Sequence, residues 1–278
     1  MLLHANVRPD TESKTMDQLF VRIGHGPLLT RRDLPFPANA VFNPGVTEID
    51  GEVVLLLRIE DTQGLSQIRV ARSSNGVDSW RIADQPILEP DLQDSPYEEW
   101  GCEDARVTQI GPSEWLIAYC AFSRYGPSAG LATTKDFVSA TRLGVVLPPT
   151  NKDATIFPEQ ISGNWVLLHR PVTGGQEHIW YSRSESDLLH WCKPGILMPE
   201  GGGPWWDSLK IGCGVPPIKT EQAGCSLSSV GGSTIGRRHR GCLSGELPRL
   251  AGLWHERRIA RTRPMLRRQH HAPPTRST

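Results

Sequence analysis

A strand and turn unit that occurs three times between residues 50 and 192 constrains the fold more than any other feature of this sequence. Each unit has two short apolar runs rich in β-branched and aromatic residues, followed by a Ser/Thr-rich turn and an aromatic residue. The paired runs are 53–61 with 66–74, 115–123 with 129–134, and 165–172 with 178–185, and the aromatic residues are Trp80, Phe137 and Trp191. Runs of this length, bounded by Gly, Asn, Asp and Pro, predict strands and no helices.

The period of the repeat predicts an all-β fold of the β-propeller type. Antiparallel strands that recur roughly every 50–60 residues are typical of propeller blades, because neighbouring blades bury each other's faces. Trp80 and Trp191 occupy equivalent positions, so we interpret them as packing residues. A chain of 278 residues is long enough for one large domain of this kind. A β-sandwich with similar hairpins is the alternative, since turn-separated strands suit that architecture too.

The distribution of charge divides the chain near residue 222. Residues 1–222 carry 19 of the 30 Lys and Arg and 28 of the 30 Asp and Glu, whereas residues 223–278 carry 11 Arg, no Lys and 2 Glu. The second segment is rich in Arg, Gly, Ser and Pro and lacks strand alternation. We expect an irregular, disordered tail at 223–278 that results from a shifted reading frame. A basic arm that binds nucleic acid is the competing interpretation, and it is less favoured because such an arm normally follows a finished domain.

Several classes of protein are disfavoured by simple patterns. The sequence has no run of 18 apolar residues, and residues 1–15 lack the pattern of a signal peptide. We therefore expect a cytoplasmic protein with no membrane partner. The six cysteines form no Cys-x-x-Cys pair and no cluster with histidine, which argues against a metal site.

Two adjacent carboxylates are candidates for acid catalysis. Cleavage of a glycosidic bond needs a carboxylic acid that protonates the departing oxygen. Glu103 and Asp104 follow a glycine and open a predicted strand. Strand alternation then places the two side chains on opposite faces, so that only one can face a pocket. The alternative is that both are structural carboxylates, paired for example with Arg106.

Four cations lie in or beside the ends of successive predicted strands, and each has apolar neighbours. They are Arg58, Lys152, Arg170 and Lys210. We expect them to converge on an anion, with Arg170 as the best bidentate ligand and Asn151 as a further donor. Their alternative partners are structural, namely Asp61, Asp153 and Asp207. His169 is a candidate ligand as well, although a histidine beside a strand is as often structural.

A third group combines aromatic and polar residues in the way that sugar sites do. Its members are Tyr97, Trp205, Trp206 and Asp207, with Asn43 and Asp61 as further partners for sugar hydroxyls.

Eight ordered segments of the chain resemble the β-mannoside phosphorylases and related mannosidases of glycoside hydrolase family 130. They are MDQLFVR (16–22), LPFPANAVFNPG (34–45), LLLRIED (55–61), GCEDARV (101–107), NKDATIFPE (151–159), LLHRP (167–171), SESDLLHW (184–191) and WWDSLKIGCGVPPIKT (205–220). The resemblance implies a five-bladed β-propeller over residues 16–222, with residues 1–15 as an extension. The family continues after Gln222 with a Gly-Trp strand and a Tyr-His-Gly segment that this sequence lacks, so we expect the last blade to be incomplete.

The resemblance also implies functions for the candidate residues. Asp104 is the expected general acid, acting through a hydroxyl of the mannose. The phosphate ligands are expected to be Arg58, Asn151, Lys152, Arg170 and Lys210. The sugar ligands are expected to be Asn43, Asp61, Tyr97, His169, Trp206 and Asp207.

The expected activity is inverting phosphorolysis of a β-mannoside, which gives α-mannose 1-phosphate and a shortened sugar. Phosphate is the co-substrate, and no cofactor, metal or nucleic acid is expected. Hydrolysis of β-mannosides and a non-catalytic carbohydrate-binding protein are the alternatives, the second of them because the final segment departs from the family. The sequence leaves the oligomeric state open, a homo-oligomer included.

Overall fold

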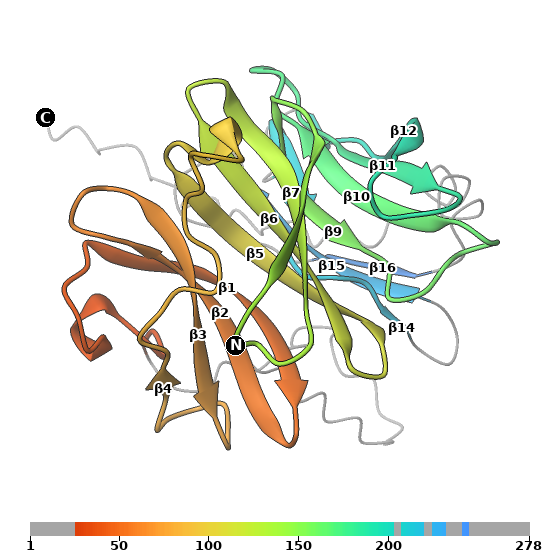
Figure 1. Ribbon diagram of the computed structural model, residues 1–278. Helices are drawn as coiled ribbons and strands as arrows, with labels where there is room; N and C mark the ends of the chain where they lie inside the picture. The colour runs from red at the N-terminus through yellow and green to blue at the C-terminus, as the bar shows by residue number, and fades with distance from the viewer. Residues whose placement is uncertain (1–25, 203–206, 220–223, 232–240, 245–278) are drawn as a thin grey trace, which may run out of the picture.

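The structure is a computed structural model that describes residues 26–202, 207–219, 224–231 and 241–244 (Figure 1). These residues form sixteen strands and two short 3₁₀ turns, η1 (Arg31–Asp33) and η2 (Pro96–Glu98). The all-β prediction is confirmed. The five-bladed propeller stays a prediction, because the described strands form three sheets and no closed ring. No helix in the described part of the chain has the length and apolarity needed to span a membrane.

The first sheet has eight strands in two halves of four. Its order is β1-β2-β3-β5-β6-β7-β8, with β4 paired to β3. The strands are β1 (Ala40–Ile49), β2 (Glu52–Glu60), β3 (Ser66–Ser73), β4 (Arg81–Ile82), β5 (Gly101–Gly111), β6 (Glu114–Ser123), β7 (Gly126–Thr134) and β8 (Thr141–Leu147). Its strand pairs are antiparallel except for β3 and β5, which share the single parallel pair Ser66 and Gly101. In their backbone pairing, the two halves are therefore almost separate four-stranded units.

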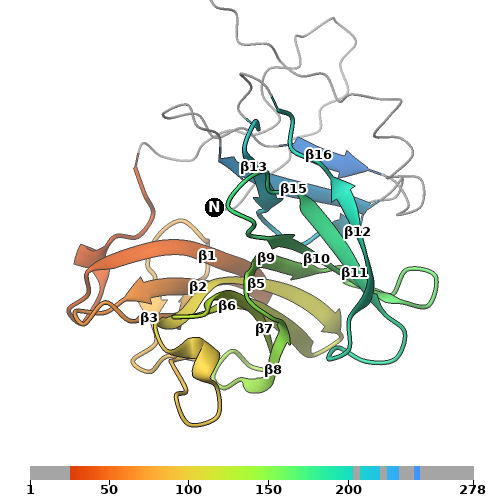
Figure 2. The same ribbon diagram turned by 90° about the horizontal axis from the view of Figure 1, so that it is seen from above.

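Two further four-stranded sheets follow along the chain. One contains β9 (Asn151–Ile156), β10 (Trp165–Pro171), β11 (Ile179–Ser184) and β12 (Cys192–Met198). The other contains β13 (Lys210–Cys213), β14 (Ile218–Lys219), β15 (Gly224–Gly231) and β16 (Gly241–Ser244). The first strands β1, β5 and β9 lie next to one another, as the view in Figure 2 shows.

The prediction of an irregular tail is wrong for the described residues after 222. Strand β15 pairs with β13, β14 and β16, so residues 224–231 and 241–244 belong to the third sheet. Backbone N–H and C=O groups form such ladders even where the sequence lacks clear alternation, because every non-proline residue supplies one donor and one acceptor. The rest of 223–278, like residues 1–15, lies outside the described residues.

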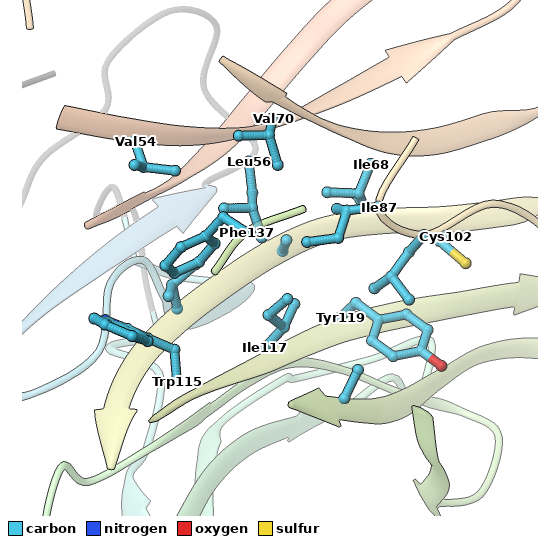
Figure 3. Close-up of a cluster of buried hydrophobic side chains, with 14 of the residues drawn as sticks. Val54, Leu56, Ile68, Val70, Ile87, Cys102, Trp115, Ile117, Tyr119 and Phe137 are labelled. Atoms are coloured by element: carbon cyan, nitrogen blue, oxygen red, sulfur yellow. The ribbon is translucent and has the colours of Figure 1, made fainter. Parts of the chain in front are cut away.

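The core consists of layers between successive sheets, and strand β6 shows why. Its odd-numbered side chains Trp115, Ile117 and Tyr119 pack against Val54, Leu56, Ile68 and Val70 of β2 and β3 (Figure 3). Its even-numbered side chains Leu116 and Ala118 pack in another cluster with Ala154, Ile156 and Leu167 of β9 and β10. Side chains on a strand alternate between its two faces, so β6 contributes to two apolar layers at once.

The repeated turns predicted from the sequence have a common hydrogen-bond pattern. Near the end of the third strand of each unit, a side-chain hydroxyl accepts hydrogen bonds from backbone N–H groups that follow it in the sequence. These hydroxyls belong to Ser73, Thr134 and Ser184. A second side chain accepts the N–H groups two and three residues ahead; these acceptors are Asn75, Asp136 and Asp187. Trp80, Phe137 and Trp191 then pack in three apolar clusters, as predicted for the first and last of them.

Candidate active site

Three first strands carry the same irregularity near their starts, a bulge in which two residues oppose one. The register shifts between Phe42 and Gly45 in β1, between Glu103 and Arg106 in β5, and opposite the step from Leu168 to Arg170 in β9. The first bulge residues are Asn43, Asp104 and Asp153. Asp104 and Asp153 have φ values of 48° and 56°, a left-handed conformation that Asp tolerates better than most residues. A bulge changes the direction of a side chain, and here it brings polar groups to the meeting point of β1, β5 and β9.

Asp104 lies at the centre of this meeting point and is 7% exposed. Its Oδ1 accepts hydrogen bonds from Arg58 Nη1 at 3.1 Å and from Asn43 Nδ2 at 3.4 Å. Lys152 Nζ lies 4.0 Å from Oδ2. The structure thus brings together four of the residues predicted from the sequence, from strands β1, β2, β5 and β9.

Glu103 contacts the same guanidinium group as Asp104. Its Oε1 accepts Arg58 Nη2 at 2.7 Å and Ser66 Oγ at 3.4 Å. Burial raises the pKa of Glu103, and the charge of Arg58 opposes that rise. The prediction that Glu103 and Asp104 point to opposite faces is wrong, because the bulge at Asp104 interrupts the alternation of side chains.

Arg58 is held in place on several sides. Besides the two carboxylates, its Nε donates to Ser66 Oγ at 3.1 Å, and its guanidinium carbon lies 4.7 Å from the centre of the Phe42 ring. These bonds use three of the five N–H groups of the guanidinium. Its other two N–H groups have no partner among the described residues, so they are candidate donors to an anion.

A second charged cluster lies beside the first, around Asp153. Arg106 Nη2 donates to Asp153 Oδ1 at 3.1 Å, and Arg170 Nη1 lies 3.0 Å from Oδ2. Arg170 Nε also lies 3.1 Å from Glu177 Oε2. Arg106 pairs with no carboxylate of β5; instead its Nη1 donates to the backbone oxygen of Asp104 at 2.7 Å. The cluster therefore joins β5, β9 and β10, and it contains the pair of Arg170 with Asp153 that we considered as the structural alternative.

His169 and Asn151 form a buried pair between β10 and β9. His169 Nδ1 lies 3.1 Å from Asn151 Oδ1, and Nε2 lies 2.9 Å from Ser182 Oγ. Burial lowers the pKa of His169 to about 4, so the ring is neutral at pH 7. With the Asn151 oxygen on the ring, its amide nitrogen is available as a donor.

The remaining predicted residues lie farther from Asp104 or act locally. Asp61 Oδ1 accepts the backbone N–H groups of Gln63 at 2.8 Å and Leu65 at 3.0 Å, so it shapes the turn between β2 and β3. Tyr97 belongs to η2 and is half-buried. Asp207 is buried, and Lys210 is exposed at the start of β13. Trp206 lies outside the described residues, as does Trp205.

The first cluster places a buried carboxylate beside two cationic side chains. One carboxylate oxygen of Asp104 has close donors and the other faces an ammonium group at 4.0 Å. The described residues bring no three His, Cys, Asp or Glu side chains together as metal ligands. A cavity of about 310 Å³ lies at the opposite ends of β1 and β5, where Glu48, Asp50 and Gln109 line it, and it is separate from Asp104.

Comparison with known proteins shows which family this region belongs to. The family model of the β-1,4-mannooligosaccharide phosphorylases matches residues 23–228. The chain belongs to glycoside hydrolase family 130. The match includes all the candidate residues and extends six residues beyond 222, the boundary expected from the sequence.

Members of family 130 with known activities cover most of this chain. A β-1,2-mannobiose phosphorylase of Listeria innocua is 32% identical, with 72% of each chain aligned. A 1,2-β-oligomannan phosphorylase of a Thermoanaerobacter species is also 32% identical over 70% of this chain, which spans 65% of that relative. The structure of the Listeria β-1,2-mannobiose phosphorylase, solved with β-1,2-mannobiose, has a TM-score of 0.69 and 29% identity and covers 79% of this chain and 77% of its own.

Sequence reasoning did not foresee the cluster around Asp153 as a unit. Arg106 and Asp153 appeared only as possible partners of other residues, and Glu177 lies in a loop without a recognisable pattern. The sequence did contain a signal for it. The similar segments Glu103-Asp104-Ala105 and Lys152-Asp153-Ala154 occupy the same positions in β5 and β9.

Proposed function

We propose that this protein catalyses the inverting phosphorolysis of β-mannosides, releasing α-mannose 1-phosphate and a shortened sugar. The observation that supports this best is the position of Asp104 among Arg58, Asn43 and Lys152, where a carboxylic acid adjoins fixed cationic donors. Phosphorolysis needs both, an acid for the leaving oxygen and a site for the phosphate nucleophile. The family relatives, which include β-1,2- and β-1,4-mannoside phosphorylases, support the same reaction.

In the proposed reaction a phosphate oxygen forms a bond to C1 of the mannose while the bond from C1 to the bridging oxygen breaks. Asp104 supplies the proton that the leaving oxygen gains, by way of a mannose hydroxyl, and regains a proton from solvent. Attack from the face opposite the leaving oxygen inverts the configuration from β to α. Lys152 and Arg58, which contact Asp104, are proposed donors to phosphate, and Asn151, Arg170 and Lys210 extend the proposed site. Asn43, Asp61, Tyr97, His169, Trp206 and Asp207 are the proposed sugar ligands.

We infer that the described sheets are blades of a five-bladed β-propeller. The two halves of the first sheet and the two following sheets each contain four strands. Neighbouring units bury apolar faces against each other, as blades do. The meeting of β1, β5 and β9 is then part of the central site, built from the first strands of three blades.

Phosphate dependence tests the proposed function. The protein is incubated with β-1,2- and β-1,4-mannobiose, with and without inorganic phosphate, and the products are separated. We expect α-mannose 1-phosphate with phosphate and no cleavage without it. Free mannose formed at the same rate in phosphate-free buffer would identify a hydrolase instead, and binding without cleavage would identify a carbohydrate-binding protein.

A further inference from the structure

Two aromatic side chains are exposed at one end of the first sheet, one just before β5, the strand that carries Asp104, and one in the turn between β6 and β7. Trp100 is 44% exposed and Tyr125 is 58% exposed. Each ring makes an edge contact with another ring, Trp100 with Phe122 at 5.3 Å and Tyr125 with Tyr97 at 6.1 Å between centroids. Both rings are at the end of the sheet where β5 begins and β6 ends, and exposed aromatic groups of this kind are candidates for a binding surface.

The backbone that carries Trp100 is fixed. Its N–H donates to the carbonyl oxygen of Phe122 at 2.8 Å, and its carbonyl oxygen accepts the N–H of Ser66 at 3.2 Å. The next residue, Gly101, has a φ of 133° and packs so closely on Ser66 that a side chain there would collide with it. The backbone position of Trp100 is therefore set before any ligand arrives.

The preceding turn is anchored by Glu98, which is fully buried. Its carboxylate accepts the Tyr119 hydroxyl at 2.7 Å and Arg142 Nη2 at 3.2 Å. It also accepts the backbone N–H of Asp91 at 3.1 Å. The short coil of η2 lies beside β6 and β7 (Figure 1). The buried Glu98 side chain thus holds the turn in place, while Tyr97 is half-buried and Trp100 is exposed.

An ion pair adds polar groups to the same surface. Arg124 Nε donates to Glu99 Oε2 at 2.8 Å, and the Arg124 side chain is 66% exposed. Arg124 adjoins Tyr125 and Glu99 adjoins Trp100 in sequence. Aromatic faces with planar charged groups at their edges suit sugars, whose rings have apolar faces and whose hydroxyls need hydrogen-bond partners.

Trp100 lies four residues before Asp104, so their Cα atoms are at most about 13 Å apart. A chain of two or more sugar units bound at Asp104 can cover that distance. We propose that Trp100 and Tyr125, with Arg124 and Glu99, bind sugar units of a β-mannoside chain beyond the bond that is cleaved. The proposal rests on the proposed function, because that function places a β-mannoside at Asp104.

Binding measurements without turnover test the subsite. Asp104→Asn is used as the parent, and its affinities for β-mannobiose and β-mannotetraose of the same linkage are measured by calorimetry. We expect the tetraose to bind more tightly, and Trp100→Ala in this parent to weaken tetraose binding by roughly tenfold while leaving mannobiose binding unchanged. Tyr125→Ala should act in the same direction, and Trp100→Phe should restore most of the loss. Val138→Ala is the control, since Val138 is 77% exposed in the turn between β7 and β8.

Equal losses for both sugars, no loss for either, or no binding of either sugar by the parent would overturn the subsite. Thermal unfolding of each variant shows whether a loss reflects misfolding, and Trp100→Phe keeps the test open if the alanine variant unfolds. The proposed function is judged separately, by product formation in the unaltered chain. If the chain does not catalyse phosphorolysis but Trp100→Ala weakens tetraose binding alone, the subsite is supported and the proposed function is wrong. If phosphorolysis is normal but Trp100→Ala weakens the binding of both sugars equally or of neither, the subsite is wrong.

Discussion

Asp104 and Asp153 occupy the same position in two neighbouring units, yet their surroundings differ. Both are the first residue of a bulge in the first strand, both have a positive φ, and they are 7% and 8% exposed. Each oxygen of Asp153 faces a guanidinium group, that of Arg106 on one side and that of Arg170 on the other. Asp104 has a guanidinium on Oδ1, whereas the closest cation to Oδ2 in the described residues is Lys152 at 4.0 Å.

The bulge thus places the two carboxylates at equivalent positions, and only their partners differ. A buried carboxylate with a guanidinium group at each oxygen links the strands that carry those groups, as Asp153 does for β5, β9 and β10. In the proposed function Asp104, which has one oxygen less tightly paired, is the carboxylate that acts on the substrate. We therefore expect substitution of Asp104 to affect mainly turnover and substitution of Asp153 to affect mainly stability.

The largest expected effect is the loss of turnover in Asp104→Asn. Asparagine keeps the size of the side chain and its oxygen for Arg58 but supplies no acidic proton, so kcat should fall by about 10²–10⁴-fold. The measurement is the rate of α-mannose 1-phosphate formation at saturating mannoside and phosphate. Mannoside binding should persist. Turnover close to that of the unaltered chain would show that Asp104 is not the acid.

Asp153→Asn should destabilise the protein instead. The substitution leaves Arg106 and Arg170 buried without their shared counter-ion, and breaking a buried pair costs about 3–5 kcal/mol of unfolding free energy. Urea unfolding of the two asparagine variants makes the comparison directly, with Asp104→Asn as the matched control. Equal stabilities would mean that the cluster around Asp153 contributes no more to the fold than the first cluster does.

The pH dependence of the unfolding free energy should show a contribution from His169, the residue opposite the bulge at Asp153. Its pKa in the folded protein is about 4, below the ordinary value of 6.5, so the unfolded chain binds its proton more readily. Stability is fully present above about pH 6.5 and falls toward pH 4, by on the order of 3 kcal/mol for this group. The raised pKa of Glu103 acts in the opposite direction, since its protonation favours the folded state as the pH falls.

His169→Gln isolates the histidine from Glu103. The difference in unfolding free energy between the unaltered chain and this variant should change with pH between about 6.5 and 4 and be flat above that range. A difference that is constant over the whole range would show that His169 is not buried as a neutral ring.

The smallest effect is expected for Lys210→Ala, which asks whether phosphate reaches the side of the site near Asp153. Lys210 is exposed, so its loss should change the stability by less than about 0.5 kcal/mol. If it binds phosphate, the phosphate concentration for half-maximal rate should rise roughly tenfold, as expected for one charged hydrogen bond. Arg170→Ala should raise it too, but with a loss of stability. A selective loss of mannoside affinity in Lys210→Ala would place it on the sugar side.

The repeat could be predicted from the sequence because it depends on local chemistry. Ser73, Thr134 and Ser184 close turns with their own hydroxyls, and Trp80 and Trp191 pack nearby. Such interactions involve residues close in sequence and leave a visible pattern. The all-β fold and the packing function of the two tryptophans followed from it.

The bulges could not be predicted, because they depend on how two strands are registered. The sequence of β5 alone suggests regular alternation, and it therefore placed Glu103 and Asp104 on opposite faces. Only the pairing of β5 with β6 shows that two residues oppose one at Asp104. The strands after residue 222 were missed for a related reason, since the pairing of β15 with β13 and of β16 with β15 involves backbone groups that have no signature in the side chains.

The two-sided packing of β6 has a consequence for synthesis of the chain on the ribosome. When β5–β8 have left the ribosome, Trp115 and Ile117 can pack on β2 and β3, which have already been synthesised. Leu116 and Ala118 cannot pack on β9 and β10 until those strands have been synthesised. The growing chain thus has an uncovered apolar surface at its most recent unit until the next unit arrives. Exposed surfaces of this kind favour aggregation and chaperone binding, so the order of translation decides which face of each sheet needs protection.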